Sequence, residues 1–478
     1  MKLQAAALAV VLAATQAAAA QRPNVVVIVA DDLGHGDIAA YGGDVATPRI
    51  DSIAQGGVRF TAGYVTAPVC NPSRAGLMSG RYQQRWGQEF NYQTAPPDGA
   101  PRSSLPQVER TLGAVMKAQG YATGAIGKWH LGMQPGYHPM DRGFDEFFGM
   151  ASGTKYVDPS WPGVHSFGNL QRFDRSEPPG EGESEDPSRL ARRGLWRGRD
   201  PAQLEEYVTD QLAKEAVAFI DRHREDPFFL YVAFNAPHAP LEATDVYYQR
   251  FPQFADERKR IHAAMISALD DGVGRILDQL RMIGVEENTL VVFTSDNGGP
   301  EVSDSDGRCN APFLGHKRNL YEGGIRLPFA MRWPARLAAG RTYDPMVSTL
   351  DLMPTLLAAA GAKPDTDAAR PLDGVDLLPF LGGDRKDATP HDALFWRSGP
   401  NGAVRQGRYK LVFGGDVTRL YDLEKDAKES HDLSASMRDR VASMRKAWDA
   451  WNAQLSPARA SARFEQTTHN GDTFRWQI

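Results

Sequence analysis

The stretch 69–81, with the sequence VCNPSRAGLMSGR, brings a thiol, a hydroxyl and a guanidinium together. Pro72 and Ser73 suit the first turn of a helix, where a missing N–H is harmless and a hydroxyl can cap. Cys70 would then lie at the positive end of the helix dipole, where an anion is favoured. Arg74, one turn on, can bind the same anion with planar geometry. The stretch therefore predicts that a thiol-derived group and an oxyanion meet here.

This motif, Cys-Asn-Pro-Ser-Arg followed by Leu-Met-Ser-Gly-Arg, resembles that of the type I sulfatases of the alkaline phosphatase superfamily. In those enzymes a maturation enzyme oxidises the motif cysteine to formylglycine, an aldehyde whose hydrate attacks sulfur. The resemblance therefore implies a formylglycine at Cys70. The alternative is a buried thiol before an ordinary helix, because a free cysteine usually packs as a small hydrophobic residue.

Reactive residues follow four apolar runs that we expect to be strands. The run 24–30 is continuous, as expected for a strand buried on both faces. Helical patterns separate the runs, at 112–119, 207–220 and 261–280, so we predict a mostly parallel sheet covered on both sides. Parallel strands release their last residues at one edge. The runs 24–30, 121–126, 228–234 and 290–294 would bring to that edge Asp31 and Asp32, Lys128 and His130, His238, and Asp296 and Asn297.

The character of the chain changes near residue 387. Short strands are expected at 393–396, 403–405, 409–413 and 419–423, then a polar helix at 436–455 and an irregular tail after Pro457. The resemblance implies an alkaline-phosphatase-like α/β fold: a large mixed, mostly parallel sheet between helices in a catalytic domain at 21–386, and a small C-terminal subdomain, an antiparallel sheet with one helix, at 387–478.

The resemblance also implies one calcium ion. Its ligands would be Asp31, Asp32, Asp296 and Asn297, together with the modified Cys70 or a sulfate oxygen. These side chains offer the hard oxygen ligands that Ca²⁺ prefers. Taken alone, Asp296 and Asn297 followed by two glycines would indicate a turn.

Further roles come from the same resemblance. Lys128 and His130 are two residues apart after a strand, so in extended backbone they point the same way. By resemblance, Lys128 and Lys317 bind sulfate, His130 is the base of the release step and His238 protonates the leaving oxygen. Ser152 is the candidate for a sulfate-binding serine. Taken singly, each would be an ordinary surface lysine or packed loop histidine.

Residues 1–20 combine Lys2 with an Ala/Leu/Val run ending in three alanines, which is typical of a secretory signal with its cleavage site. We expect an exported protein, periplasmic or extracellular, without a membrane anchor, because the run is short for a span. The net charge of −5 offers no footprint for nucleic acid. Conversion of Cys70 would leave Cys309 as a free thiol.

We expect hydrolysis of a sulfate ester on a sulfated sugar or polysaccharide. One alternative is a phosphate or phosphonate ester hydrolase, because both esters have the same shape. Another is a calcium-bound glycan-binding protein without turnover. In the stretch 154–203 the periodicity fails, and it is either a solvated insertion or a rim that selects substrate. His316 and Glu322 receive no role.

Overall fold

The computed structural model describes residues 22–91, 105–158, 160–167, 194–300, 308–362, 369–385, 387–459, 464–469 and 472–477. The expected signal segment 1–20 and the centre of the expected insertion, 168–193, lie outside the described residues. Within the described residues, no helix is both long and apolar enough to cross a bilayer.

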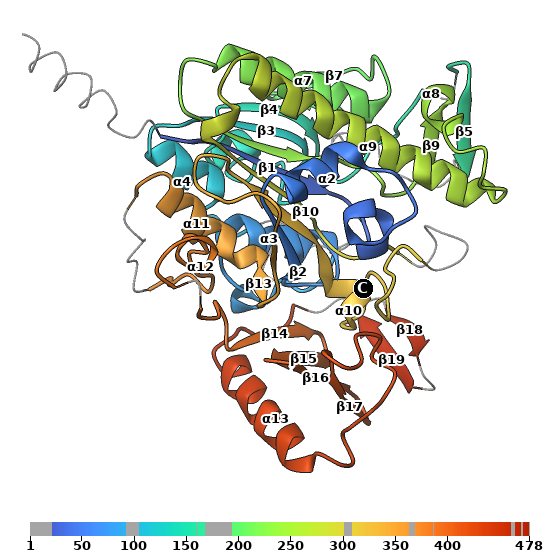
Figure 1. The fold of residues 1–478 in the computed structure, drawn as a ribbon, viewed down its shortest axis with the longest axis vertical. Helices are drawn as coiled ribbons and strands as arrows, with labels where there is room; N and C mark the ends of the chain where they lie inside the picture. The colour runs from blue at the N-terminus through green and yellow to red at the C-terminus, as the bar shows by residue number, and fades with distance from the viewer. Residues whose placement is uncertain are drawn as a thin grey trace, which may run out of the picture.

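A large mixed sheet forms the centre of the main part of the molecule (Figure 1). Strands β10, β1, β8, β3 and β4 are parallel neighbours, whereas β11 runs antiparallel to β10 and β6 antiparallel to β4. The predicted mixed, mostly parallel sheet is therefore confirmed. In spatial order the strands are β12 (Arg341–Tyr343), β2 (Val58–Tyr64), β11 (Arg326–Arg332), β10 (Thr289–Ser295), β1 (Asn24–Ala30), β8 (Phe228–Ala233), β3 (Ala122–Lys128), β4 (Glu146–Met150), β6 (Leu195–Arg197) and β7 (Asp200–Ala202), with β13 (Val347–Ser348) beside β2.

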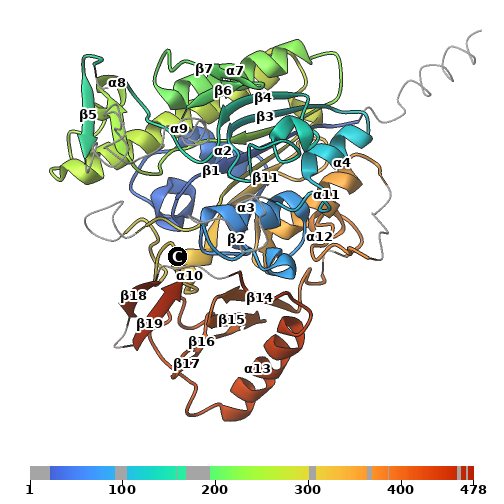
Figure 2. The same cartoon turned by 180° about the vertical axis from the view of Figure 1, so that it is seen from behind.

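Helices cover both faces of this sheet, as Figure 1 and the reverse view in Figure 2 show. Strand β1 is buried along its length, because alternate residues enter two different cores. Val26 and Ile28 pack in the core that includes α2 (Pro48–Gln55), α7 (Val208–Arg222) and α9 (Glu257–Met282). Val25 and Val27 pack in the core that includes α3 (Cys70–Ser79), α4 (Leu112–Ala118) and α11 (Leu352–Ala359).

Both described ends of the stretch 154–203 contain strands, although the sequence shows no clear periodicity there. Strand β5 (Val164–Phe167) pairs with β9 (Leu241–Thr244), and β6 and β7 extend the large sheet at its edge. These strands are only three or four residues long, too short for a clear sequence period. Among the described residues, the remaining short α-helices are α8 (Asp245–Tyr248), α10 (Glu322–Ile325) and α12 (Leu378–Leu381).

The C-terminal part is a separate antiparallel sheet with a helix, as expected. Its strands are β14 (Ala393–Ser398), β15 (Asn401–Gln406), β16 (Tyr409–Gly414) and β17 (Val417–Asp422). Helix α13 (Arg438–Asn452) packs on this sheet through Met444, Trp448 and Trp451. The division into domains at residue 386 stays a prediction.

The expectation of an irregular tail is wrong. After Pro457 the chain forms an antiparallel pair, β18 (Phe464–His469) and β19 (Asp472–Gln477). The two residues between the strands are asparagine and glycine, the pair that most favours a two-residue hairpin connection. This pair of residues is a local sequence signal for the hairpin.

A buried ion cluster joins the C-terminal sheet to the main part of the molecule. Lys410 Nζ on β16 lies 2.9 Å from Glu322 Oε1 and 2.9 Å from Glu429 Oε1, and all three side chains are buried. Tyr64 Oη on β2 donates to the other oxygen of Glu322 at 2.6 Å. Glu322, to which the sequence assigns no role, is therefore a structural connection.

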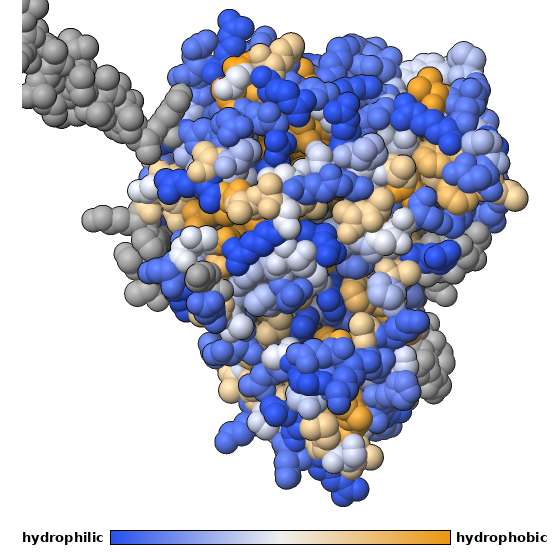
Figure 3. Space-filling model, in the orientation of Figure 1, coloured by the Kyte–Doolittle hydropathy of each residue, from blue (hydrophilic) through white to orange (hydrophobic). Residues whose placement is uncertain are grey.

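The face drawn in Figure 3 is mainly hydrophilic, with apolar residues in scattered groups.

Candidate active site

Cys70 is the first residue of helix α3, at the positive end of its dipole as predicted. Pro72 lies in the first turn, where its missing N–H leaves no intrahelical bond unmade. The expected cap by Ser73 is wrong: Ser73 lies inside the helix, the N-cap position is Val69, and no side chain caps it. At the other end Gly80 has a φ of 66°, a left-handed conformation that glycine adopts without strain.

Two carboxylates face the thiol. Cys70 Sγ lies 3.6 Å from Asp31 Oδ1 and 3.9 Å from Asp32 Oδ1, and both acids directly follow β1. One ligand atom from each of these three residues, together with one from His238, falls within 4.8 Å of the others. Such a group of oxygen, sulfur and nitrogen atoms has the size and chemistry of a metal site.

Three buried cations balance the acids of this site. A lysine or arginine on one element reaches an aspartate at the end of a strand in each case. The contacts are Lys128 Nζ to Asp31 Oδ2 at 2.6 Å, Lys317 Nζ to Asp32 Oδ1 at 2.6 Å and Arg74 Nη2 to Asp296 Oδ2 at 2.7 Å. The structure therefore brings the predicted nucleophile, the predicted sulfate-binding cations and the predicted acids into one cluster.

The charges of the cluster perturb its titrating groups. Burial raises the pKa of the Cys70 thiol to about 12, with Asp296 adding to the effect. Burial also opposes ionisation of Asp31, but Lys128, His238 and Arg74 outweigh it and hold the pKa of that carboxyl below its usual range. An unmodified thiol at position 70 is therefore protonated near neutral pH, which makes it a weak nucleophile.

Asp296 and Asn297 follow β10 and join the same cluster. Asp296 Oδ1 accepts the backbone N–H of Asp32 at 3.2 Å, and Asn297 Nδ2 donates to Asp32 Oδ1 at 2.6 Å. Among the described residues, the buried Asn297 Oδ1 has no hydrogen-bond partner. Carboxylate oxygens with an unpaired buried carbonyl oxygen fit a calcium ion. Gly298 lets α10 approach closely, since a Cβ there would lie 1.8 Å from Gly323 O.

The two histidines lie at different strand ends. The extended backbone expected through Lys128 and His130 is wrong, because β3 ends at Lys128 and His130 has a φ of 59°. His130 Nδ1 is buried and has no partner among the residues described, and burial together with Lys128 places the pKa of His130 well below its usual value. His238 lies after β8, with Nε2 3.5 Å from Asp32 Oδ2 and Nδ1 2.5 Å from Ala239 O.

Ser152, the predicted sulfate-binding serine, is half-buried just after β4. Its neighbour Ala151 accepts the backbone N–H of His130 at 2.7 Å, so Ser152 lies close to that histidine in the fold. The structure adds Tyr231 to the predicted residues: from the middle of β8, its hydroxyl accepts a hydrogen bond from Arg74 Nη1 at 3.4 Å. A phenol within an otherwise apolar strand was the signal, because a buried Tyr O–H requires a partner.

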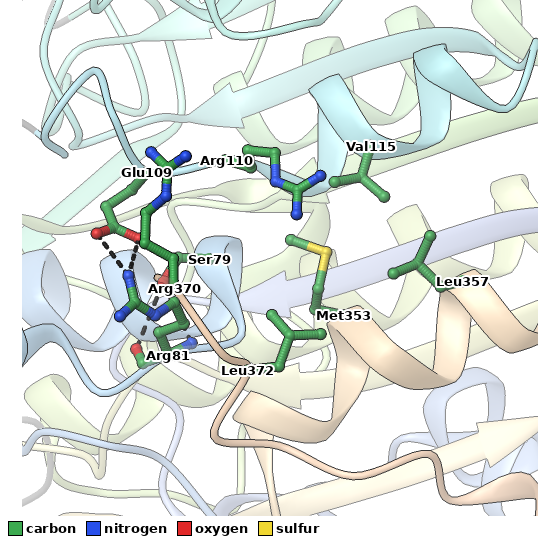
Figure 4. A pocket seen from close by; sticks show the side chains of 9 residues that line it. All are labelled: Ser79, Arg81, Glu109, Arg110, Val115, Met353, Leu357, Arg370 and Leu372. Carbon is green, nitrogen blue, oxygen red and sulfur yellow. Dashed lines mark hydrogen bonds and ion pairs between the residues drawn. The ribbon is translucent and has the colours of Figure 1, made fainter. Parts of the chain in front are cut away.

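A small cavity elsewhere in the fold is not part of this cluster. Figure 4 shows it at the far end of α3, where Arg81 and Glu109 form an ion pair of 2.6 Å. Met353, Leu357 and Leu372 form an apolar wall. None of the residues that we predicted to act on substrate lines it. The cysteine cluster is therefore the candidate active site.

Comparison with known proteins identifies the family. The family profile described as Sulfatase matches residues 23–362. This chain belongs to the sulfatase family. The profile described as N-sulphoglucosamine sulphohydrolase, C-terminal, matches residues 314–450 of this sulfatase.

Relatives with known names are sulfatases too. The chain is 36% identical to the N-acetylgalactosamine-6-sulfatase of Canis lupus familiaris, over 83% of this chain and 73% of that protein. It is 35% identical to arylsulfatase A of Homo sapiens, over 87% of this chain and 84% of that one. The crystal structure of Ps i-CgsB in complex with k-i-k-neocarrahexaose resembles it with a TM-score of 0.80 and 32% identity, covering 92% and 94% of the two chains.

The predicted family and the alkaline-phosphatase-like fold are thus confirmed, and this sulfatase is a sulfuric ester hydrolase. Cys70 beside acidic residues fits the position of a formylglycine. No disulfide joins Cys70 and Cys309 among the described residues.

Proposed function

We propose that this sulfatase releases sulfate from a sulfated sugar or glycan, with a formylglycine at position 70 and one bound calcium ion. The observation that supports this best is the position of Cys70 at the start of α3, 3.6 Å from Asp31 and surrounded by buried cations. The sugar preference follows from relatives: one is an N-acetylgalactosamine-6-sulfatase, and Ps i-CgsB forms a complex with k-i-k-neocarrahexaose.

Asp31, Asp32, Asp296 and Asn297 would hold the calcium ion together with position 70. The ion would supply positive charge beside the sulfate oxygens. A formylglycine would supply an aldehyde hydrate with two hydroxyls, one to attack sulfur and one to expel sulfate by C–O cleavage.

The cations of the chain itself would hold the sulfate group. Arg74, Lys128 and Lys317 are buried and preorganised by the acids that they contact. Donors that are already oriented stabilise charge in the transition state without further reorganisation. Ser152, half-buried beside the backbone of His130, would add a hydroxyl donor to the same sulfate.

The two histidines would divide the proton transfers. His238 would give a proton to the departing sugar oxygen, because it comes from a different strand from His130 and its ring is partly open to solvent, with its side chain 23% exposed. His130 would take the proton during release, because its buried ring is held neutral and is therefore able to accept one.

Sulfate release from a panel of sulfated glycans by the mature protein tests this proposal. We expect turnover of at least one glycan and of an aryl sulfate, with no turnover by Cys70→Ala. Matched aryl phosphate and phosphonate substrates separate the alternative reaction. Faster turnover of either of these substrates would refute the assignment to sulfate esters, and glycan binding without any turnover would indicate a binding protein.

We further propose that the chain is exported to the periplasm or the extracellular space after cleavage near residue 20, and that a formylglycine-generating enzyme modifies Cys70. The N-terminal sequence supports the first point and the Cys-Asn-Pro-Ser-Arg motif the second. The N-terminal sequence of the protein recovered from the medium or periplasm tests export. An intact N-terminus in an intracellular protein would refute it.

A further inference from the structure

Asn235 carries a buried carboxamide that the protein itself does not satisfy. The residue follows β8 and is 1% exposed. Within the part of the chain that the structure describes, neither its Oδ1 nor its Nδ2 has a hydrogen-bond partner. Native structures pair most buried polar atoms, so an amide with both atoms unpaired requires an explanation.

The register of the sheet places this residue beside the site. Val29 of β1 pairs with Ala233 of β8 in a parallel ladder, so Asp31 and Asn235 follow at the same level. The backbone N–H of Asp31 donates to Ala236 O at 3.2 Å, which shows that the two segments stay together beyond the strand ends. Neighbours at one level of a sheet are about 5 Å apart, so Asn235 lies next to the predicted calcium ligand.

The side chain also lies on the face of the nucleophile. Tyr231 and Ala233 pack in the core that includes α3, whereas Phe234 packs in the core on the opposite face. Alternation therefore directs Asn235 to the α3 side. A Cβ on Gly153, which follows β4, would lie 3.9 Å from Asn235 Oδ1. The carboxamide thus lies between Asp31 and the segment after β4.

The carboxamide has no role in the turn that holds His238. That turn is fixed through the backbone carbonyl of Asn235, which accepts the His238 N–H at 3.0 Å and the hydroxyl of Tyr156. The same hydroxyl lies 2.8 Å from His238 O. The side chain of Asn235 takes part in none of these contacts, so it remains available to a ligand.

We propose that Asn235 is a substrate-binding residue whose carboxamide bonds a sugar hydroxyl next to the sulfate ester. Two unpaired atoms, one donor and one acceptor, match a hydroxyl group, which can accept and donate at once. A sulfate oxygen could satisfy only the donor. This inference rests on the proposed action on a sulfated sugar. It gives the site a means to favour sugar sulfates over aryl sulfates.

Three substrates test the proposal: a sulfated sugar that the parent enzyme hydrolyses, its deoxy analogues lacking a hydroxyl next to the sulfated carbon, and an aryl sulfate. For Asn235→Ala and Asn235→Leu we expect kcat/KM on the sugar sulfate to fall about 5- to 30-fold, as for one lost hydrogen bond. One deoxy analogue and the aryl sulfate should change less than about twofold. Equal losses on all substrates, or no loss on the sugar, would overturn the proposal.

Thermal melting provides a second readout that a structural role would change. Because the amide has no partner in the protein, Asn235→Leu should keep or raise Tm. The matched control is Asn310→Leu, since the buried Asn310 amide accepts from Gly299 N and donates to Gly299 O, each at 2.8 Å, and its loss should lower Tm. A similar fall in both variants would assign Asn235 to the structure. A parent enzyme inactive on every sulfate ester would instead refute the proposed function, and this inference with it.

Discussion

Lys317 Nζ donates hydrogen bonds to both carboxylate oxygens of Asp32, at 2.6 and 2.8 Å. The pair ties the loop before α10 to the end of β1, and both side chains are almost fully buried. Burial opposes the charge on Asp32, but Lys317 and His238 outweigh it and lower the pKa of the carboxyl. Loss of one partner would leave the other charge uncompensated.

We therefore predict that Lys317→Met, measured in a chelator, lowers the free energy of unfolding by about 3–5 kcal/mol. Added calcium should restore part of the loss, because a divalent cation also compensates the carboxylate. Urea unfolding with and without calcium measures both effects. Lys117→Met is the control, since the Lys117 side chain is 53% exposed and its ion pair with Asp145 should contribute less than about 1 kcal/mol. Equal stability of the Lys317 variant and the parent in chelator would contradict the prediction.

Chelation of the parent should lower both activity and Tm, because an ion bound only by the folded protein stabilises it, and its removal leaves Asn297 Oδ1 buried without a partner among the described residues. Asp296→Ala should do the same in the presence of calcium. Calcium titration followed by Tm gives a readout independent of turnover. Full activity in thoroughly demetallated protein would refute a role for the ion.

Maturation should be visible in the tryptic peptide 60–74, which contains Cys70. We expect an aldehyde at that position in active protein, detectable by mass and by reaction with a hydrazide probe. Cys70→Ala should lose turnover, whereas Cys309→Ser should keep most of it, because Cys309 is not part of the group of possible metal ligands around Cys70. A fully active sample whose peptide carries only unmodified cysteine would contradict this.

Replacing His238 with Ala should reduce turnover of a sugar sulfate far more than that of an activated aryl sulfate. An aryl leaving group has a low pKa and needs little protonation, whereas a sugar alkoxide needs a general acid, worth about 10²–10⁴-fold. His130→Ala should reduce turnover of both substrates alike. Turnover of both esters by both variants checks the assignment. The opposite pattern would mean that the two roles are reversed.

Lys410→Met should lower the free energy of unfolding by about 3–5 kcal/mol, because Glu322 and Glu429 would remain buried without their shared cation. Urea unfolding measures this, with the exposed Lys425→Met as control. Adding Glu322→Gln and Glu429→Gln should recover part of the loss. A Lys410 variant as stable as the control would show that the ion cluster does not hold the C-terminal sheet.

The carboxylate of Asp270 on α9 accepts the backbone N–H of Arg49 and Ile50 in the first turn of α2, and burial raises its pKa to about 6. Because the folded-state pKa lies above the usual 3.8, this group stabilises the protein fully below pH 3.8, and that contribution is lost as the pH rises through about 6. The loss amounts to about 2–3 kcal/mol at 1.36 kcal/mol per unit.

Urea unfolding of the parent and of Asp270→Asn between about pH 4 and pH 7 isolates the contribution of Asp270 to stability. The difference in stability between them should change by about 2–3 kcal/mol between about pH 4 and pH 7, in favour of the variant at the higher pH. Asp271→Asn, one residue on and paired with Arg250, is the control. A difference in stability that stays constant between these pH values would refute the raised pKa of Asp270.

Local pattern was sufficient to predict four central strands of the sheet, β1, β3, β8 and β10, and the reactive residues that follow them. The buried run before Asp31 and the run before Asp296 both became central parallel strands, because chains of β-branched and apolar residues bury both faces of such strands. The position of Cys70 at a helix start followed from the proline and the motif around it. The hairpin after Pro457 has an equally local signal in its asparagine and glycine.

Contacts between distant residues were decided only by the tertiary structure. The left-handed turn at His130, the unpaired carboxamide of Asn235 and the burial of Lys410 between two glutamates have no local signature. Each depends on which segments pack together, and a sequence states a residue's chemistry but not which atoms will surround it. Residue types and spacing therefore determined the chemistry of this sulfatase, whereas packing alone decided which polar groups the protein satisfies and which remain open to substrate.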